Sequence, residues 1–226
     1  MTLLHCSPEN HSTYRILRQL DINIIHKDVL FAGSHDLIEK DTFQRCGVNK
    51  VICFEANNFV YTDLQERLRD TNWPHFCACL WSEVGTRKEF YFYRQKKDGA
   101  SGLFLPDKMG EYVDCQPTGE KIVLKTTTID NYIQNKIIDI SNVNLAIFDL
   151  QGSELRALIG SKLLLESCQL EWIICEVSNF SCYLGAPQEP EITHFLEKYG
   201  FRKIAFQLDW SGKNGEQHGD NIYKKY

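Results

Sequence analysis

Residues 143–178 read VNLAIFDLQGSELRALIGSKLLLESCQLEWIICEVS, and this stretch decides the fold class that we predict. It opens with an apolar run, 143–148, that reaches an acid, Asp149. After a Gln151-Gly152 turn, leucine and isoleucine recur at three- and four-residue steps, which is typical of a helix. A second apolar run, 172–175, ends in Glu176. The pattern predicts a strand, a helix and a strand, with each strand closing on a carboxylate.

The two acids are expected to share one pocket. Neighbouring strands of a parallel sheet end at a common edge, and open α/β sheets bind ligands along that edge. Asp149 and Glu176, so placed, can bind a divalent metal such as Mg²⁺, or one can act as a base while the other orients. The alternative is that each carboxylate caps the helix or turn that follows it.

The same alternation continues on both sides of this stretch. Apolar runs predict buried strands at 28–33, 50–55 and 75–81, and periodic segments predict helices at 35–47 and 59–70, the second capped by Asn57-Asn58. A helix is predicted at 189–198, followed by two strands joined by the turn SGKNGEQHG. Strands that alternate with helices predict a doubly wound α/β sheet, here with an antiparallel terminal pair.

Residues 83–126 interrupt the alternation. They are rich in glycine and proline, and the strand-like runs EFYFY (89–93) and KIVLKTTT (121–128) flank a loop. We predict a β-rich insertion within a single domain of residues 1–226. Its aromatic side chains have two interpretations, since they can stack on a sugar ring or form a small satellite core: Tyr91, Tyr93, Phe104 and Tyr112.

Charge and cysteine usage exclude several function classes. The net charge of −5 argues against general binding of nucleic acid phosphates. No apolar run approaches the ~20 residues of a membrane span, and the first residues do not read as a secretory signal. The nine cysteines include no CxxC pair and no zinc-like spacing, so we expect reduced thiols in a cytoplasmic protein.

Two further strand ends carry candidate binding residues. Ala32-Gly33-Ser34-His35-Asp36 follows the first strand, where a glycine lets the backbone approach a ligand and a helix N-terminus favours negative charge. A full GxGxxG is absent, which argues against a dinucleotide dehydrogenase. Glu55 ends the second strand, where an acid can accept hydrogen bonds from both ribose hydroxyls. The alternative is that Glu55 caps the helix after it.

These motifs resemble those of the FkbM family of S-adenosylmethionine-dependent methyltransferases over residues 28–224. IFDLQGSELRALIGS is similar to the family's K-I-D-V-x-G-x-E-x-x-V-L-x-G block, and VICFEANN to its strand-two motif with Glu55 as the ribose-binding acid. The matched positions of the first block are Asp149, Gly152, Glu154, Leu158 and Gly160. The resemblance implies a class I, Rossmann-like methyltransferase with a mostly parallel seven-stranded sheet and an antiparallel last strand.

Three positions depart from the family pattern. Phe31 stands where the family has the acid of D-x-G, Ile147 replaces a lysine, and Ala56 replaces a proline. The missing acid normally helps to hold the amino-acid end of the cofactor. The resemblance therefore implies that cofactor binding is weakened, or that His35, Asp36 or Asp149 takes over this contact.

The resemblance also implies an activity and its residues. It implies O-methylation of a sugar hydroxyl in a glycan or glycoconjugate, with glycosyltransferases of the same pathway as partners. The alternatives are another small acceptor such as a polyketide, or a non-catalytic interaction module. Catalytic candidates are Asp149, Glu176 and His35. The implied S-adenosylmethionine contacts are Gly33, Ser34, His35, Asp36, Glu55, Ala56, Leu80, Trp81 and Asp149. Neither the acceptor nor the oligomeric state follows from the sequence.

Overall fold

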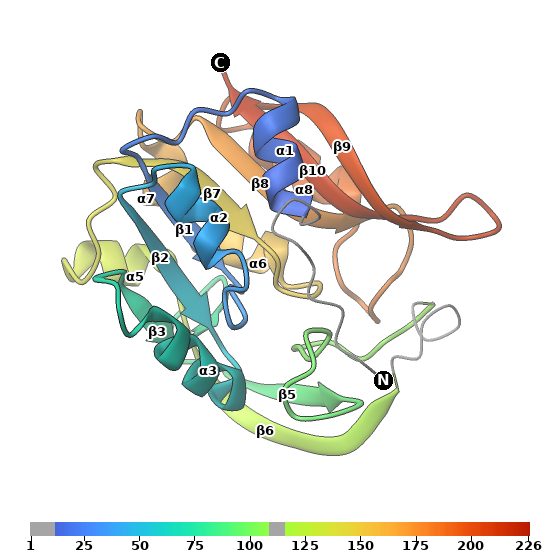
Figure 1. The fold of residues 1–226 in the computed structure, drawn as a ribbon. Coiled ribbons are helices and arrows are strands. Elements are labelled where there is room, and N and C mark those ends of the chain that lie inside the picture. Colours follow the sequence, from blue (N-terminus) through green and yellow to red (C-terminus); the bar gives the residue numbers. More distant parts are fainter. Residues whose placement is uncertain (1–11, 109–115) are drawn as a thin grey trace.

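A seven-stranded sheet forms the centre of the computed structural model, which describes residues 12–108 and 116–226 (Figure 1). β10 is antiparallel to both of its neighbours, and the other adjacent pairs are parallel. This confirms the predicted doubly wound, mostly parallel sheet with an antiparallel last strand. The strand order across the sheet is β3 (His75–Cys77), β2 (Lys50–Glu55), β1 (Asp28–Ala32), β7 (Val143–Phe148), β8 (Trp172–Ser178), β10 (Gln217–Lys225) and β9 (Phe201–Ser211).

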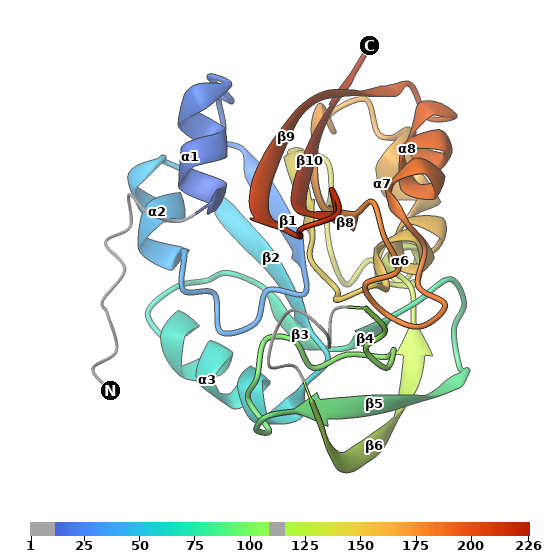
Figure 2. The same cartoon turned by 90° about the vertical axis from the view of Figure 1, so that its right-hand side faces the viewer.

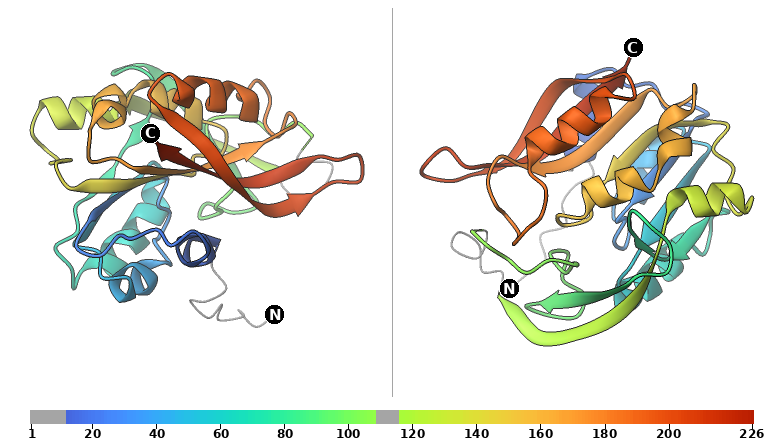
Figure 3. Two further views of the ribbon diagram at one scale, coloured as in Figure 1. Left: turned by 90° about the horizontal axis from the view of Figure 1, so that it is seen from above. Right: turned by 180° about the vertical axis from the view of Figure 1, so that it is seen from behind.

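Helices cover both faces of this sheet. Three of them, α1 (Ser12–Gln19), α2 (Lys40–Arg45) and α3 (Asn58–Leu68), pack on one face (Figure 2). On the other face lie α5 (Ile129–Gln134), α6 (Glu154–Ile159), α7 (Lys162–Glu166) and α8 (Glu189–Glu197), which Figure 3 shows from behind. Successive residues of a strand point to opposite faces, so Leu30 enters one core and Phe31 the other. No helix of the described residues has the length and apolar composition needed to cross a bilayer.

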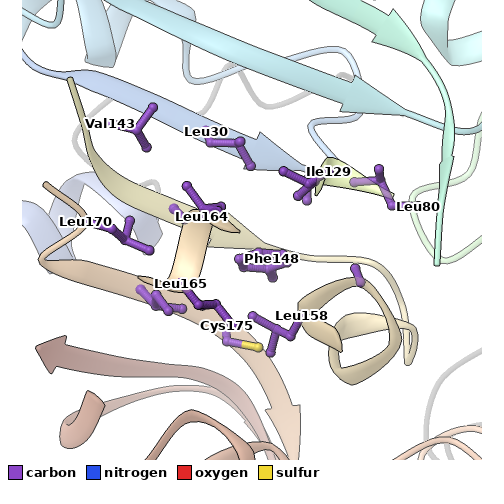
Figure 4. Packing of buried hydrophobic residues seen from close by; sticks show 14 of the residues in the cluster. Leu30, Leu80, Ile129, Val143, Phe148, Leu158, Leu164, Leu165, Leu170 and Cys175 are labelled. Carbon is purple, nitrogen blue, oxygen red and sulfur yellow. The ribbon is translucent and has the colours of Figure 1, made fainter. Parts of the chain in front are cut away.

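The core between β7, β8 and the helices of the second face is closely packed. Phe148 of β7 and Cys175 of β8 are fully buried, and Leu158 of α6 and Leu165 of α7 pack with them (Figure 4). Because the apolar run 143–148 is buried on both faces, it reads as continuously hydrophobic rather than alternating. This packing fixes the residues that follow β7 relative to the end of β8.

The predicted strand 75–81 is wrong in one respect, because the structure divides it at Ala78. β3 stays in the main sheet, whereas β4 (Cys79–Leu80) turns away and pairs with β6 (Pro117–Thr127). The amide of Ala78 donates to the Glu55 carbonyl at 2.8 Å, and that of Trp81 to the Thr127 carbonyl at 2.9 Å. β6 also pairs antiparallel with β5 (Arg87–Tyr93), which confirms the paired strands of the insertion.

Two predicted helices differ from the structure. The helix expected at 35–47 begins only at Lys40, because His35 and Leu37 both have φ of 49° and residues 34–39 form turns instead. The helix expected after Gly152 is broken between α6 and α7 at Gly160. A Cβ on Gly160 would lie 2.2 Å from the Trp81 carbonyl oxygen, so the backbone just after β4 passes directly against this glycine.

The other two helix predictions are confirmed within a residue or two. α3 spans Asn58–Leu68, and the Asn57 side chain accepts a hydrogen bond from the Phe59 amide at 3.1 Å, as an N-cap does. α8 spans Glu189–Glu197 and begins with a capping box between Gln188 and Glu191.

Candidate functional site

A cavity of about 240 Å³ lies where β1, β2 and β7 end. Six residues predicted from the sequence line it: Gly33, His35, Glu55, Ala56, Leu80 and Asp149. Four other predicted residues lie outside its lining: Ser34, Asp36, Trp81 and Glu176. The cavity thus joins the turn after β1, the end of β2 and the end of β7, which are the three strand ends on which the predicted site depended.

Gly33 lines the cavity and also has a structural role. Its φ is +81°, and a Cβ there would lie 1.7 Å from the Asp149 carbonyl oxygen. The glycine therefore admits the backbone after β7. Its amide donates to the Phe54 carbonyl at 2.8 Å, and the Ser34 amide donates to the same oxygen at 3.0 Å. Both amides are used within the protein, and no helix starts here, so this turn does not present the expected anion-binding helix N-terminus.

His35 is held on both sides of its ring. Nδ1 lies 3.1 Å from Asp36 Oδ1, and Nε2 lies 3.2 Å from the Lys97 carbonyl oxygen. The bond to Asp36 raises the pKa of His35, while the bond from His35 and the ion pair with Arg67 lower the pKa of Asp36 to about 2. These contacts favour the imidazolium, which donates from both nitrogens and cannot accept a proton. The ring environment thus suits a cationic contact in the cavity better than a base.

Glu55 holds two turns together and also lines the cavity. Its Oε2 accepts the His35 amide at 3.0 Å and its Oε1 accepts the Asn57 amide at 2.6 Å, so the carboxylate ties the turn after β1 to the turn after β2. Burial raises its pKa, and these hydrogen bonds oppose that rise. Each carboxylate oxygen has a second lone pair. Glu55, which lines the cavity, can therefore still accept hydrogen bonds from a ligand.

A loop of the insertion closes one side of the cavity. Asp98, Gly99, Ser101, Gly102 and Leu103 contribute to its lining. The loop is attached to the turns that follow β1 and β2. Asn57 Nδ2 donates to the Lys96 carbonyl at 2.6 Å, and His35 Nε2 contacts the Lys97 carbonyl oxygen. Within the loop, Arg94 binds Asp98 through Nε at 2.6 Å and through the terminal nitrogen at 3.0 Å.

One amide bridges the two acids of the opening stretch. Gln151 Nε2 donates to Asp149 Oδ1 at 2.7 Å and lies 3.1 and 3.3 Å from the two oxygens of Glu176. Tyr183 OH donates to Gln151 Oε1 at 2.5 Å, which fixes the orientation of the amide. The strand ends thus bring Asp149 and Glu176 to the same edge, as the parallel arrangement predicts. Only Asp149 lines the cavity.

Glu176 belongs to a second hydrogen-bonded group behind the cavity. Its Oε1 lies 3.2 Å from His218 Nε2, and His218 Nδ1 lies 2.8 Å from Ser178 Oγ. Burial lowers the pKa of His218, but Glu176 and the other neighbours outweigh it and raise that pKa to about 11. An imidazolium therefore faces Glu176, which makes Glu176 the counter-ion of His218.

Asp149 lies in surroundings that favour its protonated form. Burial raises its pKa well above the ordinary value, and the negative charges of Glu176, Asp220 and Glu154 raise it further. The hydrogen bond from Gln151 acts in the opposite direction. A carboxyl group with a raised pKa is a stronger base once it is ionised. The cavity thus contains a carboxyl group whose surroundings strengthen it as a proton acceptor once it is ionised.

The described residues show no metal site, which was a predicted alternative for the two acids. Residues 12–108 and 116–226 contain no group of three or more His, Cys, Asp or Glu side chains that could hold a metal ion. The amide nitrogen of Gln151, a hydrogen-bond donor, stands between Asp149 and Glu176 where a cation would have to bind both. As they are arranged, Asp149 and Glu176 do not fit a cation between them.

Glu154 supports the turn after β7. Its Oε1 accepts the amides of Leu150 at 2.7 Å and Gly152 at 3.1 Å, which explains why this position matches the family block. Burial, with the charge of Glu176, raises its pKa to about 8 from 4.5.

We expect Glu154→Gln to reduce the loss of stability at alkaline pH. The folded-state pKa of Glu154 exceeds the unfolded one, so its contribution is complete below about pH 4.5 and lost as the pH rises through about 8. Glutamine keeps one oxygen for the two amides and carries no charge. Thermal unfolding at pH 6 and at pH 9 should show a smaller decrease in Tm for the variant. Equal decreases in both proteins would contradict this assignment.

The two strand positions that depart from the family pattern are neighbours. Phe31 of β1 and Ile147 of β7 are direct partners in the parallel register, and both lie in the core beneath α2. Phe31 packs edge-on against Phe43 at 6.5 Å between ring centroids. An acid and a lysine at these positions would form a buried pair, and replacing such a pair with apolar side chains is often neutral or stabilising. The replacement of the acid by Phe31 and of the lysine by Ile147 can therefore be understood as one coupled exchange. Of the residues predicted to substitute for the missing acid, His35 and Asp149 line the cavity.

The aromatic residues of the insertion divide between the two interpretations. Tyr93 is fully buried, its OH donates to the Phe104 carbonyl at 2.6 Å, and it packs with Phe180 and Tyr183, so it belongs to a satellite core. Tyr91 is partly exposed and donates to Glu89 at 2.7 Å. For it and Phe104, stacking on a sugar stays a prediction. Tyr112 lies outside the described residues.

Trp81 is buried between cationic side chains rather than in the cavity wall. Lys88 Nζ lies 4.4 Å and Arg156 Cζ 5.6 Å from its ring centroid. Ser34 is likewise buried, with its Oγ 3.5 Å from the Phe54 carbonyl oxygen.

Several site residues were not found from the sequence. Gln151 appeared only as a turn residue, although an amide between two acid-ending strands is a signal for a bridging donor. Ser153 and His218 gave no signal, because their positions depend on how α6 and β10 pack. Asp98 belongs to the insertion loop, and no local sequence pattern indicates that this loop lies over the cavity.

One comparison with a solved structure supports this fold. The chain aligns with magnesium protoporphyrin IX methyltransferase from Synechocystis PCC 6803, determined with bound S-adenosylmethionine, at a TM-score of 0.51 and 12% identity, covering 95% of this chain and 77% of that one. It also aligns with TrmK from M. capricolum in complex with S-adenosylhomocysteine, at a TM-score of 0.49 and 8% identity, covering 93% and 67%. At such identity the first likeness shows the fold alone.

Sequence comparison adds the family. No curated protein matches the chain. The family described as the methyltransferase FkbM domain matches residues 50–203, which is more than half of the 226 residues. This span includes Glu55, the insertion, Asp149 and Glu176. The chain belongs to the FkbM methyltransferase domain family.

Proposed function

We propose that this protein transfers a methyl group from S-adenosylmethionine to a hydroxyl oxygen, with a sugar hydroxyl of a glycan or glycoconjugate as the acceptor. Family and fold support S-adenosylmethionine-dependent methyl transfer. The observation that carries the finer proposal is the position of Asp149. This carboxylate, whose surroundings favour protonation, lines the same cavity as the buried acid Glu55.

The residues of the cavity fit the methyl donor. Glu55 has unused lone pairs for the ribose hydroxyls. Ala56 and Leu80 give an apolar wall for adenine, and cationic His35 suits the carboxylate of the amino-acid end. S-adenosylmethionine, when bound, supplies a methyl group already activated as a sulfonium.

The protein's own share of the reaction is to orient the acceptor and remove its proton. A sugar hydroxyl is a very weak acid, so a positioned base favours its reaction. We assign Asp149 as that base. Gln151 orients its carboxylate through Oδ1, which leaves Oδ2 for the acceptor proton. Glu176, engaged by Gln151 and His218, acts through its charge and not as the proton acceptor.

We expect Glu176→Gln to retain turnover and to move its pH dependence. Asp149 must be ionised to act, so kcat rises with pH through its pKa. Burial raises the pKa of Asp149 most. The charges facing Asp149 are those of Glu176, Asp220 and Glu154, and of these charges Glu176 raises its pKa most. Removing that charge lowers the pKa of Asp149, and the rising limb of the kcat profile should move to lower pH. A variant inactive at every pH would instead make Glu176 the base.

Binding and acceptor assays test the proposal in sequence. Calorimetric titration with S-adenosylhomocysteine should show binding, and absence of binding at millimolar concentration would contradict an enzymatic role and favour a non-catalytic module. Methyl transfer should then be assayed against free sugars, glycosides and macrolides. Transfer to macrolides alone would favour the second candidate, a polyketide O-methyltransferase, which is the other acceptor class that the family resemblance implies.

A further inference from the structure

One buried hydroxyl in the cavity wall has no partner within the protein. In the described part of the chain, four buried side-chain polar atoms lack a hydrogen bond: Arg67 Nε, Asn144 Oδ1, Ser153 Oγ and Asn221 Oδ1. Of these four residues, only Ser153 lines the cavity, and it is 2% exposed. Folded proteins seldom leave a buried polar atom unpaired, because its lost hydration is not replaced.

The hydroxyl of Ser153 is not used by the backbone around it. Ser153 immediately precedes α6, where a serine usually accepts a hydrogen bond from the following amides. No such bond forms here. The amides of Leu150 and Gly152, in the turn before Ser153, donate to Glu154, so the serine oxygen is not used by that turn either.

Ser153 immediately precedes α6 and stands one turn before Ala157. The Ala157 amide donates to the Ser153 carbonyl at 3.0 Å, so these residues are one turn apart on the same side of the helix. Ala157 shares a core cluster with Ala78 and Leu80. The cavity that Ser153 lines is also lined by the apolar side chains of Cys79, Leu80 and Phe90.

We propose that the Ser153 hydroxyl binds the edge of the adenine ring of the methyl donor. The inference rests on the proposed function and adds a recognition residue to it. Adenine has flat apolar faces and an edge of ring nitrogens and an amine, so it needs an apolar wall with a single polar contact. A serine hydroxyl can both donate and accept at that edge. Glu55 serves the ribose, and Ser153 selects the base attached to it.

The test compares Ser153→Ala with the unmodified protein by calorimetry. The variant should bind S-adenosylhomocysteine about 10-fold more weakly, and adenosine by the same factor. The affinity for 2′-deoxyadenosine should also fall about 10-fold in the variant, because the contact is to the base and not to the sugar. Thermal unfolding of the ligand-free variant should occur at the same or a higher temperature, because the substitution removes an unpaired buried hydroxyl.

Ser161→Ala is the matched control. Ser161 is fully buried, but its Oγ donates to the Ala157 carbonyl at 2.6 Å and it does not line the cavity. This variant should have a lower Tm and an unchanged affinity for S-adenosylhomocysteine.

The outcomes separate this inference from the proposed function. If the unmodified protein does not bind S-adenosylhomocysteine, the proposed function fails. If it binds and Ser153→Ala binds equally well, the adenine contact alone is overturned. Weaker binding of S-adenosylhomocysteine with unchanged adenosine binding would also overturn it, as would an effect confined to the KM of the acceptor, which would place the hydroxyl at the acceptor instead.

Discussion

Replacing Asp149 with asparagine is expected to lower kcat for methyl transfer by about 10²- to 10⁴-fold, the usual contribution of a general base. Asparagine keeps the shape of the side chain and an oxygen that can accept from Gln151, but it cannot take a proton. The affinity for S-adenosylhomocysteine should change much less than kcat. Steady-state kinetics and calorimetry on the same preparation measure the two effects.

The pattern of losses distinguishes two roles of Asp149. A large loss of kcat with nearly unchanged affinity supports the base. A large loss of affinity with normal kcat would instead assign Asp149 to the amino-acid end of the cofactor, in place of the acid missing at Phe31. Asp70→Asn is a suitable control, because this acid pairs with Lys40 and lies outside the cavity lining. It should leave the catalytic step unchanged.

Replacing Glu55 with alanine is expected to weaken binding of S-adenosylhomocysteine by about 100-fold or more. Each charge-assisted hydrogen bond to a ribose hydroxyl contributes about 1.5–3 kcal/mol, and the carboxylate has lone pairs for two of them. The variant should also have a lower Tm, because Glu55 accepts the amides of His35 and Asn57. Calorimetry and thermal unfolding report the two consequences separately.

A ligand cycle separates the ribose contact from disruption of these turns. S-adenosylhomocysteine and its 2′-deoxy analogue are titrated into both proteins. If Glu55 binds the 2′-hydroxyl, the unmodified protein should discriminate strongly between the two ligands, and Glu55→Ala should hardly discriminate. Equal discrimination by both proteins would show that the ribose is not held by this acid, even if overall affinity decreases.

The exchange at Phe31 and Ile147 bears on whether the chain is an enzyme. Taken singly, each departure suggests decay of a cofactor site. Because the two side chains are register partners in one core, their joint replacement preserves packing. The cavity is still lined by Glu55, His35 and Asp149. The departures therefore do not by themselves favour a non-catalytic module.

The sequence by itself determined the sheet and the edge at which the site lies. Long apolar runs marked β1, β2, β7 and β8 because a strand buried on both faces has few polar positions. Parallel strands end at one edge, so the acids at or just after the apolar runs, Glu55, Asp149 and Glu176, could be grouped without coordinates. Side-chain caps such as Asn57 were also predictable, since they depend on neighbours in the chain.

Only the tertiary structure decided what these groups do. The break at Gly160 and the positive φ of Gly33 arise from contacts with the Trp81 and Asp149 backbones, which are distant in sequence. The register that pairs Phe31 with Ile147 likewise has no local signature. Ser153 Oγ is unpartnered only because the fold buries it in a cavity wall. Local patterns predict elements, whereas burial and hydrogen-bond partners are set by packing between elements.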